Sequence, residues 1–206
     1  MLTPIQIYCE LLEGELSDNE ELSDYLNEIN QAVNECKTVA NQLLNFGRNH
    51  TTSSSNAKFD SVEVIRGHIK RLRSSLPNSI ELVSKLPDTA VFLCGERLQL
   101  VQLLFNLCIN SIHAMEQSGG TLTISYSTEG EEAILNISDT GSGMSEETKK
   151  HLFKSGFTTK KEGMGNGLGL AIVCKIVDQF DGKITFTSIE NIGTTFTIRF
   201  PTCENC

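Results

Sequence analysis

A polar segment near residue 50 separates two different patterns of apolar residues in this chain. Before this segment, residues 2–46 place apolar side chains at helical spacing, and from about Glu20 the spacing is close to a heptad repeat. After it, from Phe59, short alternating stretches typical of strands are mixed with longer helical stretches. The change of period predicts an α+β chain with a helical part first and a mixed part second.

The first part is expected to form two helices joined near residue 17. Ser17, Asp18 and Asn19 favour a helix N-cap, so the second helix is predicted to begin just after them. An antiparallel hairpin cannot cover all of its apolar surface alone, and dimerisation into a four-helix bundle would cover the rest. We therefore predict a homodimer through helices 2–46. The expected boundaries are 1–47 for the hairpin, 48–57 for a linker and 58–206 for the second domain.

The second part is expected to mix helices with short strands. The predicted order is helix 61–76, strands 80–86 and 90–94, a long helix from about 96 to 117, strands 122–127 and 133–138, a short helix beginning near 145, helix 168–180, and strands 183–189 and 194–200. Residues 154–167 hold four Gly and little apolar content, which predicts a mobile loop.

Composition excludes some functions. The net charge of −9 argues against a nucleic-acid partner, because binding to a phosphate backbone needs a basic patch. No run of eighteen apolar residues exists, so we expect no membrane contact by this segment. The seven Cys are scattered, several of them in apolar stretches, which favours buried reduced thiols over a disulfide framework. Cys203-Glu-Asn-Cys206 is expected to be a frayed tail.

One face of the long predicted helix presents a row of amide side chains. Gln102, Asn106 and Asn110 recur every four residues, which places them on the same side of a helix. A buried amide needs hydrogen-bond partners, so such a row beside apolar residues is unusual as packing alone. A neutral amide oxygen suits a Mg²⁺ ion that already lies among phosphates and waters. A polar shoulder at the edge of the helix explains the row equally well at this point.

Three further segments combine glycine with polar chemistry. Asp139-Thr-Gly141-Ser-Gly143 follows a strand, where a carboxylate can accept from an exocyclic amine and glycines allow close approach to a flat base. Residues 152–160 place Phe beside Gly, and Lys160 can contact phosphate. Residues 163–169 repeat Gly at every second position where a helix opens, which exposes N–H groups to phosphate. Each segment alone also fits an ordinary turn or a solvated loop.

Taken in order, these four segments resemble the boxes of the GHKL ATPase superfamily and, within it, sensor histidine kinases of the nitrogen-regulator and hybrid type. The N box is at 102–114, the first glycine box at 139–143, the F box at 152–160 and the second glycine box at 165–170. Leu2-Thr3-Pro4-Ile5 is similar to the segment just after the family's phosphoacceptor. The resemblance implies a dimerisation hairpin followed by an α/β sandwich of the GHKL (Bergerat) type that binds ATP and Mg²⁺.

The resemblance also implies roles for individual residues. Asn110 would be the Mg²⁺ ligand, Asn106 would lie by the γ-phosphate, and Lys160 would hold phosphate. Asp139 would bind the adenine amine, helped by Gly143 and a water near Thr195. His113 stands where many of these kinases have a basic residue, although an exposed bystander fits as well. The other implied nucleotide contacts are Gly141, Met144, Phe157, Thr159, Gly165, Asn166, Gly167, Leu168 and Gly169.

The phosphorylated His of the family would lie about six residues before Leu2, less than two helical turns upstream. None of the four His lies on the first predicted helix, so the chain is expected to begin after the acceptor and not to autophosphorylate. The implied function is the catalytic core of a cytoplasmic two-component histidine kinase, with any membrane anchor upstream. It would transfer the γ-phosphoryl group to that His and on to an Asp of a response-regulator receiver domain. The alternatives are a degenerate kinase or phosphotransfer adaptor that binds a receiver, another GHKL ATPase, and a non-catalytic interaction bundle.

Overall fold

The computed structural model describes residues 57–152 and 169–203. The chain divides into two units, Met1–Ser53 and Ser54–Cys206, and all described residues belong to the second. The predicted hairpin and nearly all of the predicted linker therefore lie outside the described residues. Within the two described ranges, no helix has the length and apolar content needed to span a membrane.

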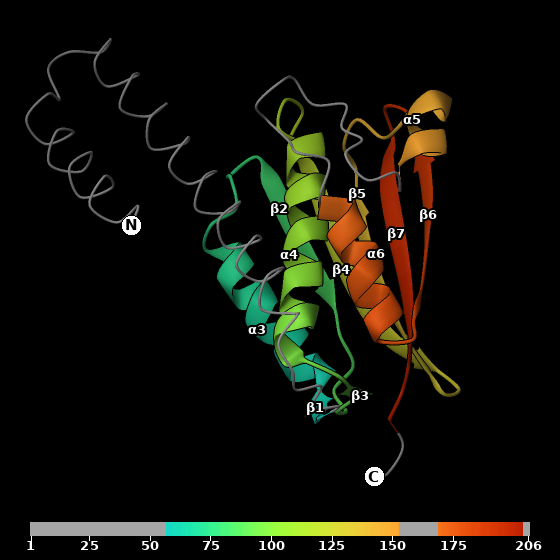
Figure 1. Cartoon of the computed structure of the whole chain (residues 1–206). Helices are drawn as coiled ribbons and strands as arrows, with labels where there is room; N and C mark the ends of the chain where they lie inside the picture. The colour runs from blue at the N-terminus through green and yellow to red at the C-terminus, as the bar shows by residue number, and fades with distance from the viewer. Residues whose placement is uncertain (1–56, 153–168, 204–206) are drawn as a thin grey trace, which may run out of the picture. The chain divides into compact units, whose positions relative to one another are not determined.

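A five-stranded sheet forms one layer of the second unit, with strand order β2-β4-β5-β7-β6 (Figure 1). Strand β2 (Ile80–Lys85) pairs in parallel with β4 (Gly120–Glu129). The other pairings are antiparallel, and they join β4, β5 (Glu132–Asp139), β7 (Gly193–Pro201) and β6 (Lys183–Ile189). A separate pair at the base joins β1 (Lys58–Asp60) to β3 (Phe92–Cys94).

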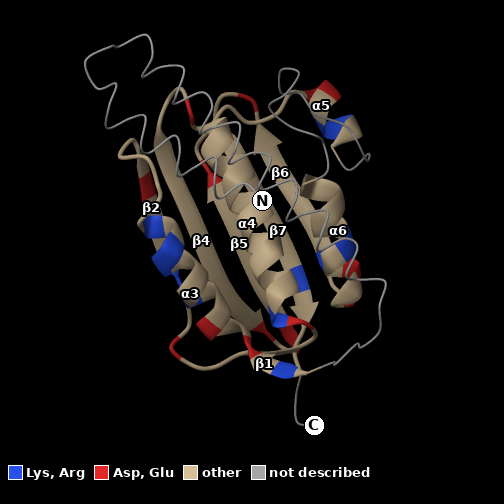
Figure 2. Cartoon of the chain, turned by 60° about the vertical axis from the view of Figure 1, so that its left-hand side comes forward, with Lys and Arg blue, Asp and Glu red and all other residues tan. Residues whose placement is uncertain are grey.

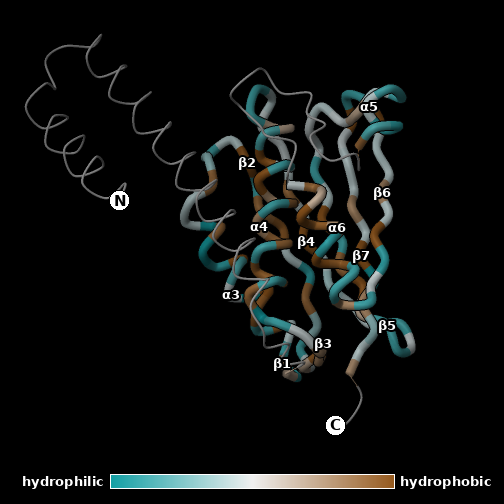
Figure 3. The backbone as a smooth tube through the Cα atoms, viewed as in Figure 1, coloured by the Kyte–Doolittle hydropathy of each residue, from teal (hydrophilic) through white to brown (hydrophobic). Residues whose placement is uncertain are grey.

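Three helices lie side by side over one face of this sheet (Figures 1 and 2). They are α3 (Ser61–Arg73), α4 (Arg97–Ala114) and α6 (Gly169–Gln179), and the short α5 (Glu146–His151) follows β5. Asp60 is the N-cap of helix α3, and its side chain accepts from the Val62 N–H at 2.9 Å. The central helix α4 carries much of the core, and Figure 3 shows hydrophobic residues concentrated along it and along the central strands.

The alternation of side chains gives the sheet two chemically different faces. On the face under the helices, Ile124, Ile137 and Phe196 lie in register and are buried. On the other face, the neighbouring row contains Thr123, Ser138 and Thr195. The helix layer therefore packs against aliphatic and aromatic side chains, and the opposite face carries hydroxyl groups.

The predicted α+β architecture of the second unit is confirmed, with shifts at the ends of elements. The helix expected to reach Gln117 ends at Ala114. The chain changes direction at Gly119, which has φ +64° and whose N–H donates to the Met115 carbonyl at 2.8 Å. The strand predicted at 90–94 is shortened to Phe92–Cys94. Strand β1 was not predicted, since three residues are too few to show an alternating pattern.

The prediction of reduced thiols is wrong for Cys94 and Cys203. Cys94 and Cys203 form a disulfide across 109 residues, with Cα atoms 5.8 Å apart. Cys203 is also not part of a frayed tail, because its N–H donates to the Phe92 carbonyl at 2.9 Å. No sequence spacing indicates a pair so far apart. Cys108 is free and buried, as predicted, and Cys174 is free and half-buried.

Candidate functional site

The covered face of the sheet ends in a polar row. Asp139 of β5 lies opposite Thr194 of β7, and Thr194 lies opposite Ser188 of β6. All three are buried, and the hydroxyl groups of Ser188 and Thr194 are 2.9 Å apart. The next row of the same face contains Ile137 and Phe196. The polar row therefore lies at the boundary between the apolar core and the loops at one end of the sheet.

Asp139 is held by the backbone. Its side chain is 5% exposed, and its Oδ1 accepts from the Gly141 N–H at 3.0 Å and the Thr194 N–H at 3.3 Å. Burial raises the pKa of this carboxyl, while the N–H groups of Gly141 and Thr194 and the side chain of Ser111 oppose that rise. Both backbone bonds end on Oδ1, so Oδ2 keeps acceptor capacity for an N–H group of a ligand.

Glycines around Asp139 allow the protein's own backbone segments to meet. A Cβ at Gly141 would lie 2.5 Å from the Ala114 carbonyl oxygen at the end of α4. Gly143 has φ +61°, and a side chain there would collide with the Ile189 carbonyl. The sequence interpretation gave these glycines to contact with a flat base. In the structure, backbone atoms occupy the positions that side chains would take at these glycines, so the loop after Asp139 can pack between α4 and the β6–β7 turn. Their contact with a base stays a prediction.

The amide row of α4 lies beside the start of α6. Asn106 is buried, and Asn110 is half-buried one turn further on. A Cβ at Gly169, the first residue of α6, would lie 3.8 Å from Asn106 Oδ1 and 4.0 Å from Asn110 Nδ2. The end of the second glycine box and the N box are therefore adjacent, although 59 positions separate Gly169 from Asn110. Ser111, next on α4, is buried, and its side chain is close enough to Asp139 to oppose the rise of the pKa of that carboxyl.

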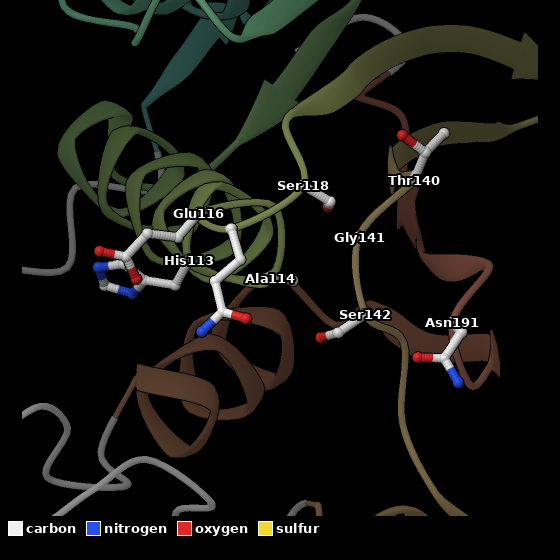
Figure 4. Close-up of a pocket in the computed structure, with 9 residues that line it drawn as sticks. His113, Ala114, Glu116, Ser118, Thr140, Gly141, Ser142 and Asn191 are labelled. Atoms are coloured by element: carbon white, nitrogen blue, oxygen red, sulfur yellow. The ribbon is translucent and has the colours of Figure 1, made fainter.

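A pocket of about 560 Å³ opens beside this arrangement, at the end of α4 (Figure 4). Figure 4 shows His113 and Glu116 on one side and Ser142 and Asn191 on the other. The loop after β5 is joined to the β6–β7 turn by a hydrogen bond, since the Asn191 N–H donates to the Ser142 carbonyl at 2.7 Å. The lining residues are His113, Ala114, Glu116, Gln117, Ser118, Thr140, Gly141, Ser142 and Asn191. Two of the predicted nucleotide residues, His113 and Gly141, belong to this set.

Sequence reasoning missed Thr194 and named its neighbour. Thr194 contacts Asp139 through its N–H, whereas Thr195 lies on the opposite face with its hydroxyl 2.7 Å from Ser138 Oγ. The alternation along β7 was the signal that could have separated the two. Met144 is half-buried and packs against the core. The remaining predicted residues lie outside the described ranges: Phe157, Thr159, Lys160, Gly165, Asn166, Gly167 and Leu168.

Comparison with known proteins identifies the family that has this arrangement. The family model described as "Histidine kinase-, DNA gyrase B-, and HSP90-like ATPase" matches residues 95–204, more than half of the chain. The chain belongs to this ATPase family. Its matched part includes the amide row of α4, Asp139 and the start of α6, so it is an ATP-binding domain by family. The alternative of a non-catalytic interaction bundle therefore does not agree with the family.

The relatives of this ATPase domain are named as sensor kinases. The sensor histidine kinase ZraS of Salmonella typhi is 39% identical over 104 residues, which cover 50% of this chain and 22% of ZraS. The signal transduction histidine-protein kinase AtoS of Escherichia coli is 26% identical over 200 residues, 97% of this chain and 32% of AtoS. The chain therefore spans between about a fifth and a third of the length of these relatives.

Solved structures show the same fold. The catalytic domain of histidine kinase ThkA is 27% identical with a TM-score of 0.63, over 73% of this chain and 96% of the ThkA domain. ThkA in complex with the response regulator protein TrrA has a TM-score of 0.71 at 24% identity, over 98% of this chain and 57% of the ThkA chain. The first of these likenesses agrees with the family assignment from sequence, and the second supports the fold.

Proposed function

We propose that residues 58–206 are the ATP-binding catalytic domain of a two-component sensor histidine kinase, joined by a linker at 48–57 to a dimerisation hairpin at 1–47. The observation that carries this proposal is the environment of Asp139. It is a buried carboxylate, anchored at one oxygen by the N–H groups of Gly141 and Thr194. Such a group is suited to accept a hydrogen bond from the exocyclic amine of adenine through its other oxygen.

The same carboxylate explains a preference for adenine. The 6-position of adenine carries an amine, which is a donor, whereas the 6-position of guanine carries a carbonyl oxygen, which is an acceptor. An ionised carboxylate has only acceptors, so Asp139 has no donor to offer the carbonyl oxygen of guanine. Its Oδ1 already accepts from backbone N–H groups. We therefore expect ATP to bind more tightly than GTP.

The residues around the amide row fit a metal held mainly by the substrate. Among the described residues, no cluster of three or more His, Cys, Asp or Glu side chains could hold a metal alone. Asn110 presents an amide beside the start of α6, and a single neutral ligand of this kind suits Mg²⁺ that is otherwise bound by phosphates and water. Mg²⁺ would neutralise charge on the transferring phosphate. Asn106, Lys160 and the Gly165–Gly169 turn are proposed to position the phosphates.

The proposed reaction transfers the γ-phosphoryl group of ATP to a His of the kinase and then to an Asp of a response-regulator receiver domain. Such transfers depend mostly on positioning and on neutralisation of charge. The amide row and the anchored carboxylate would position the nucleotide, whereas Mg²⁺ and Lys160 would neutralise the charge of the phosphates. ThkA, a kinase with a catalytic domain 27% identical to this chain, has been solved with a response regulator, and we propose a partner of that class here. The location is proposed to be cytoplasmic.

Calorimetric titration of the full chain with ATP and Mg²⁺ tests the proposal. Asp139→Asn removes the anionic acceptor and should weaken ATP about 10- to 100-fold, because hydrogen bonds to charged groups are among the stronger ones. Asn110→Ala should reduce the part of the affinity that depends on Mg²⁺ and leave binding in EDTA unchanged. GTP should bind more weakly than ATP to the parent protein.

Two control variants keep the result specific. Asp88→Asn removes an exposed carboxylate. Asn136→Ala removes an amide on the open face of the sheet, which is the face opposite the helices, where Asn136 Oδ1 accepts from the Thr197 hydroxyl at 2.7 Å. Both should bind ATP like the parent. Unchanged affinity in Asp139→Asn and Asn110→Ala would contradict the proposed pocket. No ATP binding by a folded parent would instead favour the adaptor function, in which the chain serves only to bind a receiver domain.

A further inference from the structure

The disulfide lies at the opposite end of the second unit from the candidate site. Cys94 ends β3 in the small sheet at the base, and Cys203 follows the end of β7 by two residues. Figure 1 places β1, β3 and the C-terminal end of the described chain together at this base. The bond therefore joins the small sheet to the last strand of the large sheet.

The two cysteines would stay close after reduction. The Cys203 N–H donates to the Phe92 carbonyl at 2.9 Å, and the Thr202 N–H donates to the Glu131 carbonyl at 2.8 Å. The first bond holds the C-terminal segment beside β3 and the second holds it beside the β4–β5 turn, both independently of the sulfur–sulfur bond. Because the two thiols are already held close together, the disulfide can re-form without the entropy cost of closing a long loop.

The pair is also accessible, in contrast to another cysteine of the unit. Cys94 and Cys203 are half-buried. Cys108 is fully enclosed in α4, and burial raises its pKa to about 12, which suppresses the thiolate needed for exchange. Cys174 is half-buried and free, and serves as an internal reference. Small disulfide and dithiol compounds can therefore reach the Cys94–Cys203 pair while Cys108 stays protected.

We propose that Cys94 and Cys203 form a reversible thiol–disulfide site that exchanges with low-molecular-weight disulfides of the glutathione class. One cysteine thiolate attacks the small disulfide and displaces one small thiol, which leaves a mixed disulfide on the protein. The second cysteine thiolate then attacks the bonded protein sulfur and displaces the second small thiol. Two protein thiols are oxidised and one small disulfide is reduced to two thiols, so no further oxidant is needed.

The exchange has a structural consequence at the entry to the domain. Cys94 lies in register with Lys58, and the Gly95 N–H donates to the Ala57 carbonyl at 3.2 Å, at the first described residues of the unit. The disulfide thus fixes the strand that pairs with β1 to the end of β7. Oxidation is expected to reduce local opening of the β1–β3 pair, and reduction is expected to restore it.

The test equilibrates the full chain in glutathione buffers of increasing oxidised fraction, followed by acid quenching, alkylation and peptide mapping. The expected result is a Cys94–Cys203 linked peptide that rises and falls with the buffer, while Cys108 stays alkylated as a free thiol and Cys174 enters no linked peptide. Cys94→Ser and Cys203→Ser should each abolish that peptide, and Cys174→Ser should leave it unchanged. A Cys203–Cys206 bridge in its place, or a linked peptide that never responds to the buffer, would overturn the proposal.

Hydrogen exchange supplies a second readout in the same samples. Amides of Gly95 and Cys203 should exchange more slowly in the oxidised parent than in the reduced parent, and Cys94→Ser should match the reduced parent in both buffers. Amides near Asp139, at the other end of the unit, serve as the reference. Equal exchange at Gly95 and Cys203 in both redox states would show that the bond does not control the base of the domain.

Discussion

The β5–β7 ladder has buried side chains near both of its ends, but they are stabilised by different interactions. At one end, Asp139 is in register with Thr194 and is held by hydrogen bonds from backbone N–H groups. At the other end, Ala133 is in register with Phe200, and the Phe200 ring lies 5.5 Å from that of Phe180 in an edge contact. A buried carboxylate costs free energy unless it is satisfied, whereas a buried aromatic ring stabilises by contact alone. The ladder therefore combines an end suited to binding with an end suited to stability.

The aromatic end is continuous with the entry to the domain. Phe180, which ends the α6 region, contacts both Phe200 and Phe59 of β1, with ring centroids 5.5 Å and 6.2 Å apart. The φ of Gly95 is +153°, and a side chain there would meet the Phe180 ring. Among the described residues, no buried polar side chain without a hydrogen-bond partner lies at this end. The stability of this end therefore depends on how closely the rings pack. Variants at the two ends should therefore separate stability from nucleotide binding.

The largest effect is expected from Phe200→Ala. Phe200 is fully buried, and loss of its ring should lower the free energy of unfolding by roughly 3–5 kcal/mol. Denaturant unfolding of the full chain measures this loss, and the exposed ring of Phe92 provides the matched control, Phe92→Ala, with a much smaller loss. The folded fraction of Phe200→Ala should bind ATP with the parent's affinity. A parallel fall in ATP affinity would show that the two ends are coupled.

The comparison can be sharpened with a buried polar group that lacks the partners of Asp139. His68 of α3 is 6% exposed, and within the described part of the chain its Nε2 has no hydrogen-bond partner. Burial, with a smaller contribution from Arg71, lowers the pKa of His68 from 6.5 to about 4. Between these two pH values the unfolded chain binds a proton that the folded chain does not. The free energy of unfolding should therefore fall by about 3 kcal/mol as the pH drops from 6.5 to 4.

Urea unfolding of the full chain across this pH range measures the effect, with His68→Leu as the variant. The buried imidazole is replaced by an apolar group that does not titrate, so the contribution of His68 to the slope between pH 6.5 and 4 should disappear. Asp139 acts in the opposite direction, because its pKa is raised and the folded state takes up that proton first as the pH falls. Comparison of the two proteins cancels this term. Equal slopes would mean that His68 is not buried as a neutral group.

Sequence reasoning found the elements and the chemical types of the site, but not their neighbours across the fold. The four-residue spacing of Asn106 and Asn110 is a local signal, and it placed both correctly on one helix. That Gly169 lies beside these amides depends on how α6 packs against α4, which no local pattern contains. The Cys94–Cys203 pair was missed for the same reason, since its two members lie at the ends of different sheets.

Thr194 and Thr195 show how a one-residue ambiguity follows from strand geometry. They are the same residue type at adjacent positions, so composition cannot distinguish them, and the resemblance to the kinases led to Thr195. Only the pairing of β7 with β5 decides which one faces the helices, because neighbouring residues on a strand point to opposite faces. A prediction displaced by one residue along a strand therefore moves the side chain to the other face of the sheet.

Thr195→Val should therefore give the smallest effect. Its hydroxyl lies 2.7 Å from Ser138 Oγ on the open face, and loss of that bond should lower the free energy of unfolding by about 0.5–1 kcal/mol. The ATP affinity should not change, because the variant leaves Asp139 and the Thr194 N–H as they are. Thr194→Val is the matched variant on the covered face, where a buried bond to Ser188 is lost and the cost in stability should be larger. If Thr195→Val weakens ATP as much as Asp139→Asn does, the nucleotide contacts the open face of β7, and the division of the ladder into a binding end and a stability end is wrong.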